Sequence, residues 1–432
     1  MNIFRIEQND VYTKFANFAA IIHNLDFMKK RFINPKYYAT RDPEMRHLNT
    51  FDEFLENMAE VARDDFRKML GYPATENRNM DGFYDWYVKA GMTHVFMNNA
   101  GDPFGDTSVK FSTMSIERKT IKFFATLLGI NADNVWGLIT ASGTDGNNHG
   151  IYFGAQKLKN ETGLLPIVYV SKESHYSNMR LCDLQNLEVR LIDCDEMGRM
   201  KPEALRAAIY PGRPALMIYS MGSTFKGAID DQAALNDVID DVNPIAVYRH
   251  VDAALFGGYL PFTEYHDMVD YNKCGYQSIA ISGHKFIGVD APCGMFITTR
   301  CSLEAQKSYT VGYLNGNMPM INCSRSSIIP LKFYWIIDRI GIEGFSEQAQ
   351  TILEDADFML AEMHMVGGPA WKNDCSNTIF FKRPSEKLTY EYNLARGYDE
   401  RLGGELAHVV VMQKVTRDMI SMFISDLENE ID

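Results

Sequence analysis

Short runs of almost uninterrupted apolar residues, separated by stretches with helical spacing, restrict the folds open to this chain. The runs cover residues 135–141, 166–171, 189–195, 215–220, 245–254, 278–285 and 294–299. Strands that are apolar on both faces are typical of a mostly parallel sheet covered by helices on each side. We therefore predict an α/β fold. Such sheets bind ligands at the carboxyl ends of their strands, so the residues that follow each run matter most.

The remaining segments indicate further parts. The chain has 432 residues, whereas single hydrophobic cores stop growing at about 250–300 residues. In the segment FDEFLENMAEVARDDFRKML apolar residues recur three and four apart, which predicts an N-terminal helical segment over residues 1–65. We expect a large domain over 66–312. Long helical stretches, short strands at NTIFFKRP and HVVVMQ and a closing helix predict a smaller α+β domain over 313–432.

Composition excludes several classes of protein. Lys and Arg number 43 against 56 Asp and Glu, a net charge of −13, which argues against a nucleic-acid partner. The seven cysteines form no CxxC pair, so we expect neither a disulfide framework nor a metal site. No stretch of 18 apolar residues is present, and the first residues do not resemble a signal peptide. We therefore expect a cytoplasmic protein that does not span a membrane.

Polar residues follow three of the predicted strands. Ser142, Gly143 and Thr144 enter a helix after the run 135–141, and small residues with free N–H groups suit a phosphate. The alternative is a glycine turn with a Ser or Thr helix cap, and the spacing is not that of a nucleotide-binding motif. His175 follows the run 166–171, where a purely structural histidine is the alternative. Thr224 lies in a polar loop after 215–220 and is a weak signal alone.

Two charged residues stand in apolar surroundings. Asp252 is followed by two alanines and a leucine, and a buried carboxylate is costly unless it faces a cation, although it can also cap a helix. Lys285 lies between small and apolar residues, where desolvation favours the neutral, nucleophilic amine; a solvated turn lysine is the alternative. A phosphate site, a histidine, an acid and an amine at successive strand ends together suit pyridoxal phosphate, which needs a lysine and an acidic partner.

Longer segments carry a resemblance to a known family. TASGTDGN, SKESHYS, GSTFKGAIDD, HVDAALFGGYLPF and SGHKFIGVDAPCG are similar to motifs of the group II pyridoxal-phosphate-dependent amino-acid decarboxylases. NNAGDPFG, AWKNDCSNTIFFKRPSEK and AHVVVMQKVT resemble the branch of bacterial histidine decarboxylases and plant serine decarboxylases, so that the similarity covers roughly residues 90–430. The resemblance implies fold-type I architecture, with a mostly parallel, seven-stranded-type sheet. It also implies a homodimer with active sites at the interface and the N-terminal segment in dimer contact.

The resemblance also implies roles for individual residues. Lys285 would form the Schiff base with the cofactor, and Asp252 would pair with its pyridine nitrogen. His175 would stack on the cofactor ring and Ala254 would touch its other face. The phosphate would be bound by Ser142, Gly143, Thr144, Ser282 and His284.

Two further residues concern the substrate. Thr224 would lie near the cofactor's phenolic oxygen or the substrate carboxylate. Tyr313, in a loop that the resemblance places near the neighbouring subunit's site, is the candidate proton donor to the α-carbon; packing at the interface is the alternative.

The chain departs from the family pattern near the substrate. Asp145 stands where the family more often has Glu, Gln413 replaces a usual Pro, and in 312–330 only Tyr313 and Ser324-Arg325 match the usual loop. We predict decarboxylation of L-histidine to histamine. The alternatives are serine, aspartate or glutamate, or an aromatic amino acid as substrate, a carbon–carbon lyase, an aminotransferase, or a catalytically silent regulatory protein.

Overall fold

The computed structural model describes residues 51–75, 80–105, 109–304, 306, 309–314 and 316–431. The chain divides into two compact units, Met1–Met69 and Leu70–Asp432. In the first unit the described part is the helix α3 (Phe51–Lys68), which agrees with the helical spacing of that segment. The rest of the predicted N-terminal segment lies outside the described residues. The proposed domain boundaries at 65 and 312 stay predictions.

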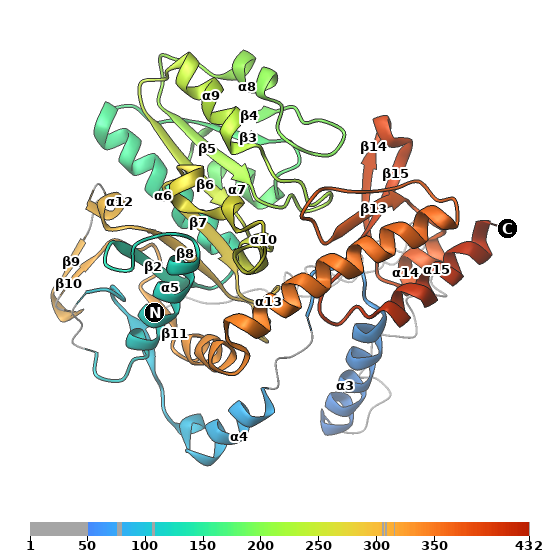
Figure 1. Ribbon diagram of the computed structural model, residues 1–432. Coiled ribbons are helices and arrows are strands. Elements are labelled where there is room, and N and C mark those ends of the chain that lie inside the picture. Colours follow the sequence, from blue (N-terminus) through green and yellow to red (C-terminus); the bar gives the residue numbers. More distant parts are fainter. Residues whose placement is uncertain are drawn as a thin grey trace, which may run out of the picture. The chain divides into compact units, whose positions relative to one another are not determined.

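The second unit contains a seven-stranded sheet in the order β2-β8-β7-β6-β5-β3-β4 (Figure 1). Strand β8 runs antiparallel to both of its neighbours, and the other adjacent pairs are parallel. The predicted α/β fold with a mostly parallel sheet is therefore confirmed. The strands are β2 (Val135–Thr140), β3 (Ile167–Ser171), β4 (Glu188–Ile192), β5 (Ala215–Ser220), β6 (Val247–Asp252), β7 (Ser278–Ser282) and β8 (Gly294–Thr299).

Apolar residues on both faces of this sheet explain why other elements pack against each face. Val168 and Leu216 belong to a core with Phe153 of α6, whereas their neighbours Tyr169 and Met217 belong to a second core on the other face. Successive side chains of a strand point to opposite faces, so a run without polar residues must be buried on both. The principal helices of this region are α5 (Met114–Leu127), α6 (Gly143–Thr162), α7 (Tyr176–Leu184), α8 (Pro202–Ala208) and α9 (Gln232–Val242).

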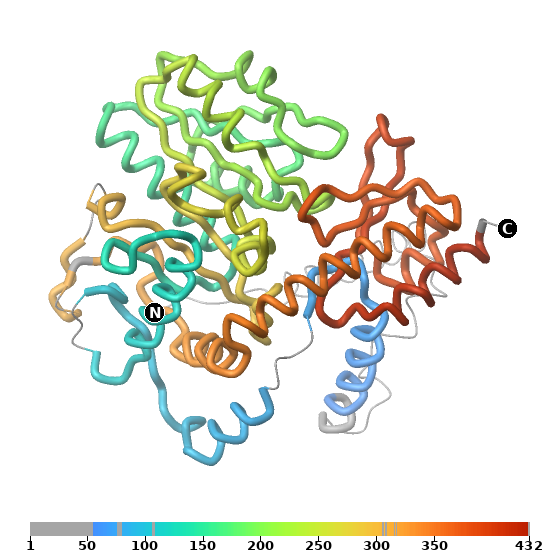
Figure 2. The backbone as a smooth tube through the Cα atoms, in the orientation of Figure 1, coloured from blue at the N-terminus to red at the C-terminus, as the bar shows by residue number. Residues whose placement is uncertain are grey.

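A long helix leads from the large sheet to a C-terminal sheet. Helix α13 (Ile328–Met365) is kinked at Gly341, whose φ of 66° is left-handed, and Figure 2 shows its course in orange toward the red C-terminal strands. Those strands form an antiparallel sheet in the order β12-β13-β15-β14. The elements are β12 (Ala370–Lys372), β13 (Thr378–Lys382), α14 (Glu386–Glu391), β14 (Ala395–Asp399), β15 (Gly404–Val410) and α15 (Arg417–Ile431).

The C-terminal strands differ from the sequence expectation in one respect. The last strand begins at Gly404, four residues before the predicted HVVVMQ segment, because its first residues pair with β14. The sequence of β14, ARGYD, contains no apolar run, so nothing in its pattern predicts a strand.

Smaller elements precede, interrupt or follow the strands of the large sheet. A buried ion pair holds one of them, β11 (Ser324–Ser326), against α5: Arg325 donates from Nη2 to Oε2 of Glu117 at 3.1 Å. Among the residues that the structure describes, no helix has the length and apolarity that crossing a membrane requires. The remaining helices and strands are α4 (Asp81–Lys89), β1 (Asn98–Ala100), α10 (Phe256–Tyr259), α11 (Tyr271–Cys274), α12 (Arg300–Glu304), β9 (Tyr309–Val311), β10 (Gly316–Met318) and β11 (Ser324–Ser326).

Candidate active site

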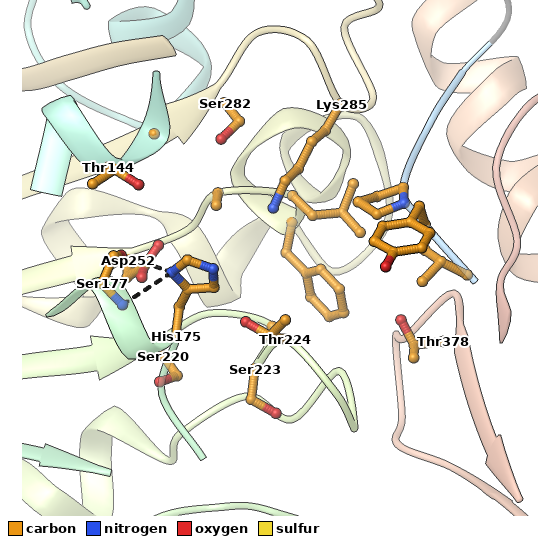
Figure 3. Close-up of a pocket in the computed structure, with 18 of the residues that line it drawn as sticks. Thr144, His175, Ser177, Ser220, Ser223, Thr224, Asp252, Ser282, Lys285 and Thr378 are labelled. Atoms are coloured by element: carbon orange, nitrogen blue, oxygen red, sulfur yellow. Dashed lines mark hydrogen bonds between the residues drawn. The ribbon is translucent and has the colours of Figure 1, made fainter. Parts of the chain in front are cut away.

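A cavity of about 260 Å³ lies at the carboxyl edge of the large sheet. The residues that follow β2, β3, β5, β6 and β7 line it, together with residues of the C-terminal sheet and the short segment 71–73 (Figure 3). Ten residues predicted from the sequence meet here: Ser142, Gly143, Thr144, His175, Thr224, Asp252, Ala254, Ser282, His284 and Lys285. Tyr313 does not line this cavity. It lies in the turn Gly312–Leu314 between β9 and β10, with 80% of its surface exposed.

Lys285 extends its amine into the cavity, toward the side on which His175 and Asp252 lie (Figure 3). Among the described residues its Nζ has no hydrogen-bond or ion-pair partner. Burial lowers the pKa of its ammonium below the usual value, and attraction by the Asp252 carboxylate opposes this effect only in part. A larger fraction of the amine is therefore neutral and nucleophilic than in a solvated lysine.

Lys226 shows the opposite environment. Only 1% of its side chain is exposed, and its Nζ donates to Oε1 of Glu173 at 2.9 Å and to Oδ2 of Asp399 at 2.6 Å. These ion pairs join the loop after β5, which carries Thr224, to the end of β14. Lys226 thus has a structural role in this loop and is not available as a nucleophile.

Asp252 is the last residue of β6 and is buried beside the cavity. Its Oδ2 accepts a hydrogen bond of 2.8 Å from Nδ2 of Asn178 on α7. Its Oδ1 accepts no hydrogen bond from any described residue. One carboxylate oxygen is therefore fixed by the protein and the other is available to a ligand.

His175 caps the N-terminus of α7. The backbone N–H of Ser177 donates to its Nδ1 at 3.3 Å, and Oγ of Ser177 lies 2.7 Å from the same nitrogen. Burial lowers the pKa of His175; the Asp252 carboxylate opposes the shift and the Lys285 ammonium adds to it. The ring is therefore mainly neutral at pH 7 and presents an uncharged flat surface.

The start of α6 offers backbone donors next to small residues. Oγ of Ser142 accepts from N–H of Asp145 at 3.2 Å, which leaves the N–H groups of Gly143 and Thr144 outside this cap. A Cβ on Gly143 would lie 2.3 Å from Oγ of Ser282, so only glycine allows these two elements to approach so closely. Burial raises the pKa of Asp145, but hydrogen bonding and attraction by His149 outweigh it and hold the pKa below its usual value.

The far wall of the cavity comes from the C-terminal sheet and the segment 71–73. Thr378 lies across the cavity from Asp252 (Figure 3). Nδ1 of His408 lies 2.7 Å from the carbonyl oxygen of Phe225 and Nε2 lies 3.0 Å from that of Gly71. His408 thus lies between two parts of the wall. Burial lowers the pKa of its imidazole, and the neutral ring has one N–H to donate to one of these two carbonyl oxygens.

Several lining residues were not predicted from the sequence. Asn147 and Ser177 lie within the motifs described above. Asn147 follows Thr144 by about one helical turn, and Ser177 follows His175 by two residues. Thr378, His408 and the segment 71–73 lie far away in the sequence, and no pattern connects them with the strand ends.

Comparison with known proteins identifies the chain. Residues 156–367 match the model of the pyridoxal-dependent decarboxylase conserved domain. A histidine decarboxylase of Solanum lycopersicum is 31% identical over 88% of this chain and 89% of its own length. Serine decarboxylase 1 of Oryza sativa subsp. japonica is 30% identical over 83% of this chain and 71% of its own. The chain belongs to the pyridoxal-dependent decarboxylases. It is therefore an amino-acid carboxy-lyase whose cofactor is pyridoxal phosphate.

Solved structures support the fold of this decarboxylase. The L-methionine decarboxylase of Streptomyces sp. 590 superimposes with a TM-score of 0.75 at 21% identity, over 88% of this chain and 96% of that one. A sphingosine-1-phosphate lyase of Burkholderia pseudomallei gives a TM-score of 0.72 at 16% identity, over 89% and 91% of the two chains. The fold alone thus does not separate a decarboxylase from a lyase of that kind; the sequence relatives do. The aminotransferase and the silent regulatory protein considered above are set aside.

The cavity of this decarboxylase fits pyridoxal phosphate. Among the described residues, the amine of Lys285 and the Oδ1 atom of Asp252 have no hydrogen-bond partner. At the start of α6, Gly143 leaves room that a side chain would fill, beside the hydroxyls of Ser142 and Ser282. An aldehyde, a pyridine nitrogen and a phosphate would each find a complementary group.

Proposed function

We propose that this decarboxylase acts on an L-amino acid with an uncharged side chain, with L-histidine, converted to histamine, as its preferred substrate. L-Serine is the second candidate, because serine decarboxylases and histidine decarboxylases are about equally similar to the chain. Aspartate and glutamate are less compatible with the cavity wall described next.

The observation that carries this proposal is the absence of a charged partner for the substrate side chain. Among the described residues that line the cavity, Lys285 and Asp252 are the only Lys, Arg, Asp or Glu. The far wall offers the hydroxyls of Thr378 and Tyr72 together with apolar residues, and the loop after β5 adds the hydroxyl of Ser223. Hydroxyls can bond an imidazole or a serine hydroxyl, whereas burying a charged side chain without a partner is costly.

Lys285 and Asp252 have the main catalytic roles in this proposal. When bound, pyridoxal phosphate supplies an electron sink for the pair of electrons that departing carbon dioxide leaves behind. Lys285 anchors the cofactor through its neutral amine, yields that place to the substrate amine, and takes it back when the product leaves. Asp252 holds the proton on the pyridine nitrogen, because its carboxylate stabilises the positive charge there.

Other residues bind and orient. His175 and Ala254 would cover the two faces of the cofactor ring and so orient the substrate bound to it. Thr224 positions the phenolic oxygen or the substrate carboxylate. The phosphate is held by Ser142, Gly143, Thr144, Ser282 and His284.

We also propose that the protein is a homodimer in which Tyr313 acts in the neighbouring subunit's site. Tyr313 protrudes on the hairpin of β9 and β10 and does not reach the cavity of its own chain. In the partner's site its phenol would donate the proton to the α-carbon.

The test is a comparison of amino acids with the purified holoenzyme. Release of carbon dioxide and formation of amine are measured for L-histidine, L-serine, L-aspartate, L-glutamate, L-lysine and L-tyrosine. We expect kcat/KM to be highest for histidine, then serine, and lower by about 10²-fold or more for the charged substrates, because their charge stays unpaired. A preference for a charged amino acid would refute the proposal. Aldehyde formation without carbon dioxide would indicate a carbon–carbon lyase instead.

A variant of similar shape tests whether the hydroxyl of Thr378 in the far wall binds the substrate. Thr378→Val keeps the shape of the side chain and removes the hydroxyl. It is expected to lower kcat/KM for the preferred substrate by about 2–10-fold, the effect of one neutral hydrogen bond, and to leave the dissociation constant of pyridoxal phosphate unchanged. Unchanged kcat/KM would show that Thr378 does not contact the substrate.

A further inference from the structure

Asn178, in the first turn of α7, contacts Asp252 and is not among the residues that line the cavity. It is completely buried. Its Nδ2 donates to Oδ2 of Asp252 at 2.8 Å and to Oγ of Ser174 at 2.9 Å. Its Oδ1 is buried and has no hydrogen-bond partner in the part of the chain that the structure describes. Both amide hydrogens are therefore used and the amide oxygen is not.

This orientation of the Asn178 amide leaves its buried carbonyl oxygen unpaired, which is unfavourable, so the two donated hydrogen bonds must compensate for that cost. The reversed orientation would bring Oδ1 against Oδ2 of Asp252, and two acceptors repel each other while the carboxylate is ionised. The observed arrangement gives the Asp252 carboxylate a hydrogen-bond donor. His175, His250 and Lys285 are the other titratable groups whose charges act on Asp252, and none of them donates a hydrogen bond to it among the described residues.

We propose that Asn178 is a positioning residue that keeps the proton shared by Asp252 and the cofactor on the pyridine nitrogen. By donating to Oδ2 it stabilises the carboxylate form and fixes its plane, so that Oδ1 remains directed to the ligand. A carboxylate stabilised in this way competes less well for the proton, and the ring stays protonated as an electron sink requires. The inference rests on the proposed pairing of Asp252 with the pyridine nitrogen.

The test measures the proton directly. The enzyme is loaded with pyridoxal phosphate labelled with ¹⁵N in the ring, and the ¹⁵N chemical shift reports the ratio of protonated to unprotonated nitrogen. In Asn178→Ala we expect this ratio to fall by about tenfold, as loss of a hydrogen bond to a charged group predicts. We also expect kcat to fall while KM stays within about twofold.

Ser174→Ala is the matched control, since it removes the other partner of the same amide and leaves the contact with Asp252. Its ¹⁵N shift is expected to equal that of the unmodified enzyme. Asp252→Ala gives the reference ¹⁵N shift for a cofactor ring that lacks the carboxylate partner. Asn178→Leu fills the space that alanine leaves, and it replaces Asn178→Ala if that variant does not fold.

The outcomes separate the two proposals. An altered shift in both Asn178 variants and not in Ser174→Ala supports the positioning role. A shift that changes in Asp252→Ala but not in the Asn178 variants overturns this inference and leaves the role of Asp252 intact. If Asp252→Ala also leaves the ¹⁵N shift unchanged, the pairing of Asp252 with the ring fails and the inference fails with it.

Discussion

The partners around each side chain determine which buried charged residues can take part in chemistry. Lys226 and Lys285 both lie near the cavity, yet Lys226 is held by Glu173 and Asp399, whereas Lys285 has no polar partner among the described residues. The sequence predicted Lys285 correctly as a member of the cavity because it follows a strand between small residues. It did not predict the ion pairs of Lys226, because Asp399 lies 173 residues away in the chain.

At the same scale, Asp252→Ala tests the acid of the site. We expect kcat to fall on the order of 10³-fold or more, because an unprotonated pyridine is a poor electron sink and several kcal/mol of transition-state stabilisation are lost. Circular dichroism and thermal unfolding check that the variant is folded. Near-normal turnover in a folded variant would contradict the assigned role.

The loop between β5 and α9 shows how an element is held in place by one buried acid. Asp230 accepts hydrogen bonds from the backbone N–H of Met200 at 2.8 Å and of Ser220 at 2.7 Å, and it is almost fully buried. It thereby fixes the end of β5 from which the loop to Thr224 starts. Burial raises the pKa of Asp230 to about 6, although the two backbone hydrogen bonds lower it.

This pKa predicts a pH dependence of stability. The folded-state pKa of about 6 exceeds the ordinary aspartate pKa of 3.8, which applies in the unfolded chain. The contribution of Asp230 to the free energy of unfolding is therefore complete below pH 4 and is lost as the pH rises through 6. It amounts to roughly 2–3 kcal/mol. The free energy of unfolding in urea, measured from pH 4.5 to 7.5, should include this decrease with rising pH in the unmodified protein.

Asp230→Asn provides the comparison. Its amide cannot ionise, so the component should disappear. The variant should also be less stable by about 1–3 kcal/mol, because its NH₂ group faces one of the two backbone N–H groups. Equal pH dependence in both proteins would show that Asp230 does not titrate in this range.

Helices and strands with a regular pattern of apolar residues could be predicted from the sequence, whereas elements without such a pattern could not. Most strands of the large sheet appear as apolar runs because both of their faces are buried, whereas the edge strand β4 is exposed or half-buried except at Ile192. Strand β14 has exposed and half-buried residues in alternation with glycine among them, so its sequence carries no such run. Thr378, His408 and Gly71 reach the cavity only through packing of the C-terminal sheet against the loop after β5, which no local pattern encodes.

For the whole molecule, mixed dimers test whether Tyr313 acts across an interface. Tyr313→Phe alone should consume substrate but accumulate aldehyde and lose activity during turnover, because the α-carbon no longer receives its proton efficiently. Lys285→Ala should be inactive. If the two variants are dissociated and mixed in equal amounts, half of the dimers are mixed, and each mixed dimer has one site that combines Lys285 with an intact Tyr313. One quarter of all sites is then complete, so about a quarter of the activity should return. No recovery in verified mixed dimers would place Tyr313 outside the partner's site.

The position of the covalent anchor tests the account most directly, since the whole site is built around the cavity at the carboxyl edge of the sheet. The holoenzyme is reduced with borohydride, digested, and the peptide that carries the pyridoxyl group is sequenced. We predict a single labelled peptide containing SGHKFIG with the label on Lys285. A label on Lys226, on Lys172 or on any other lysine would contradict the account.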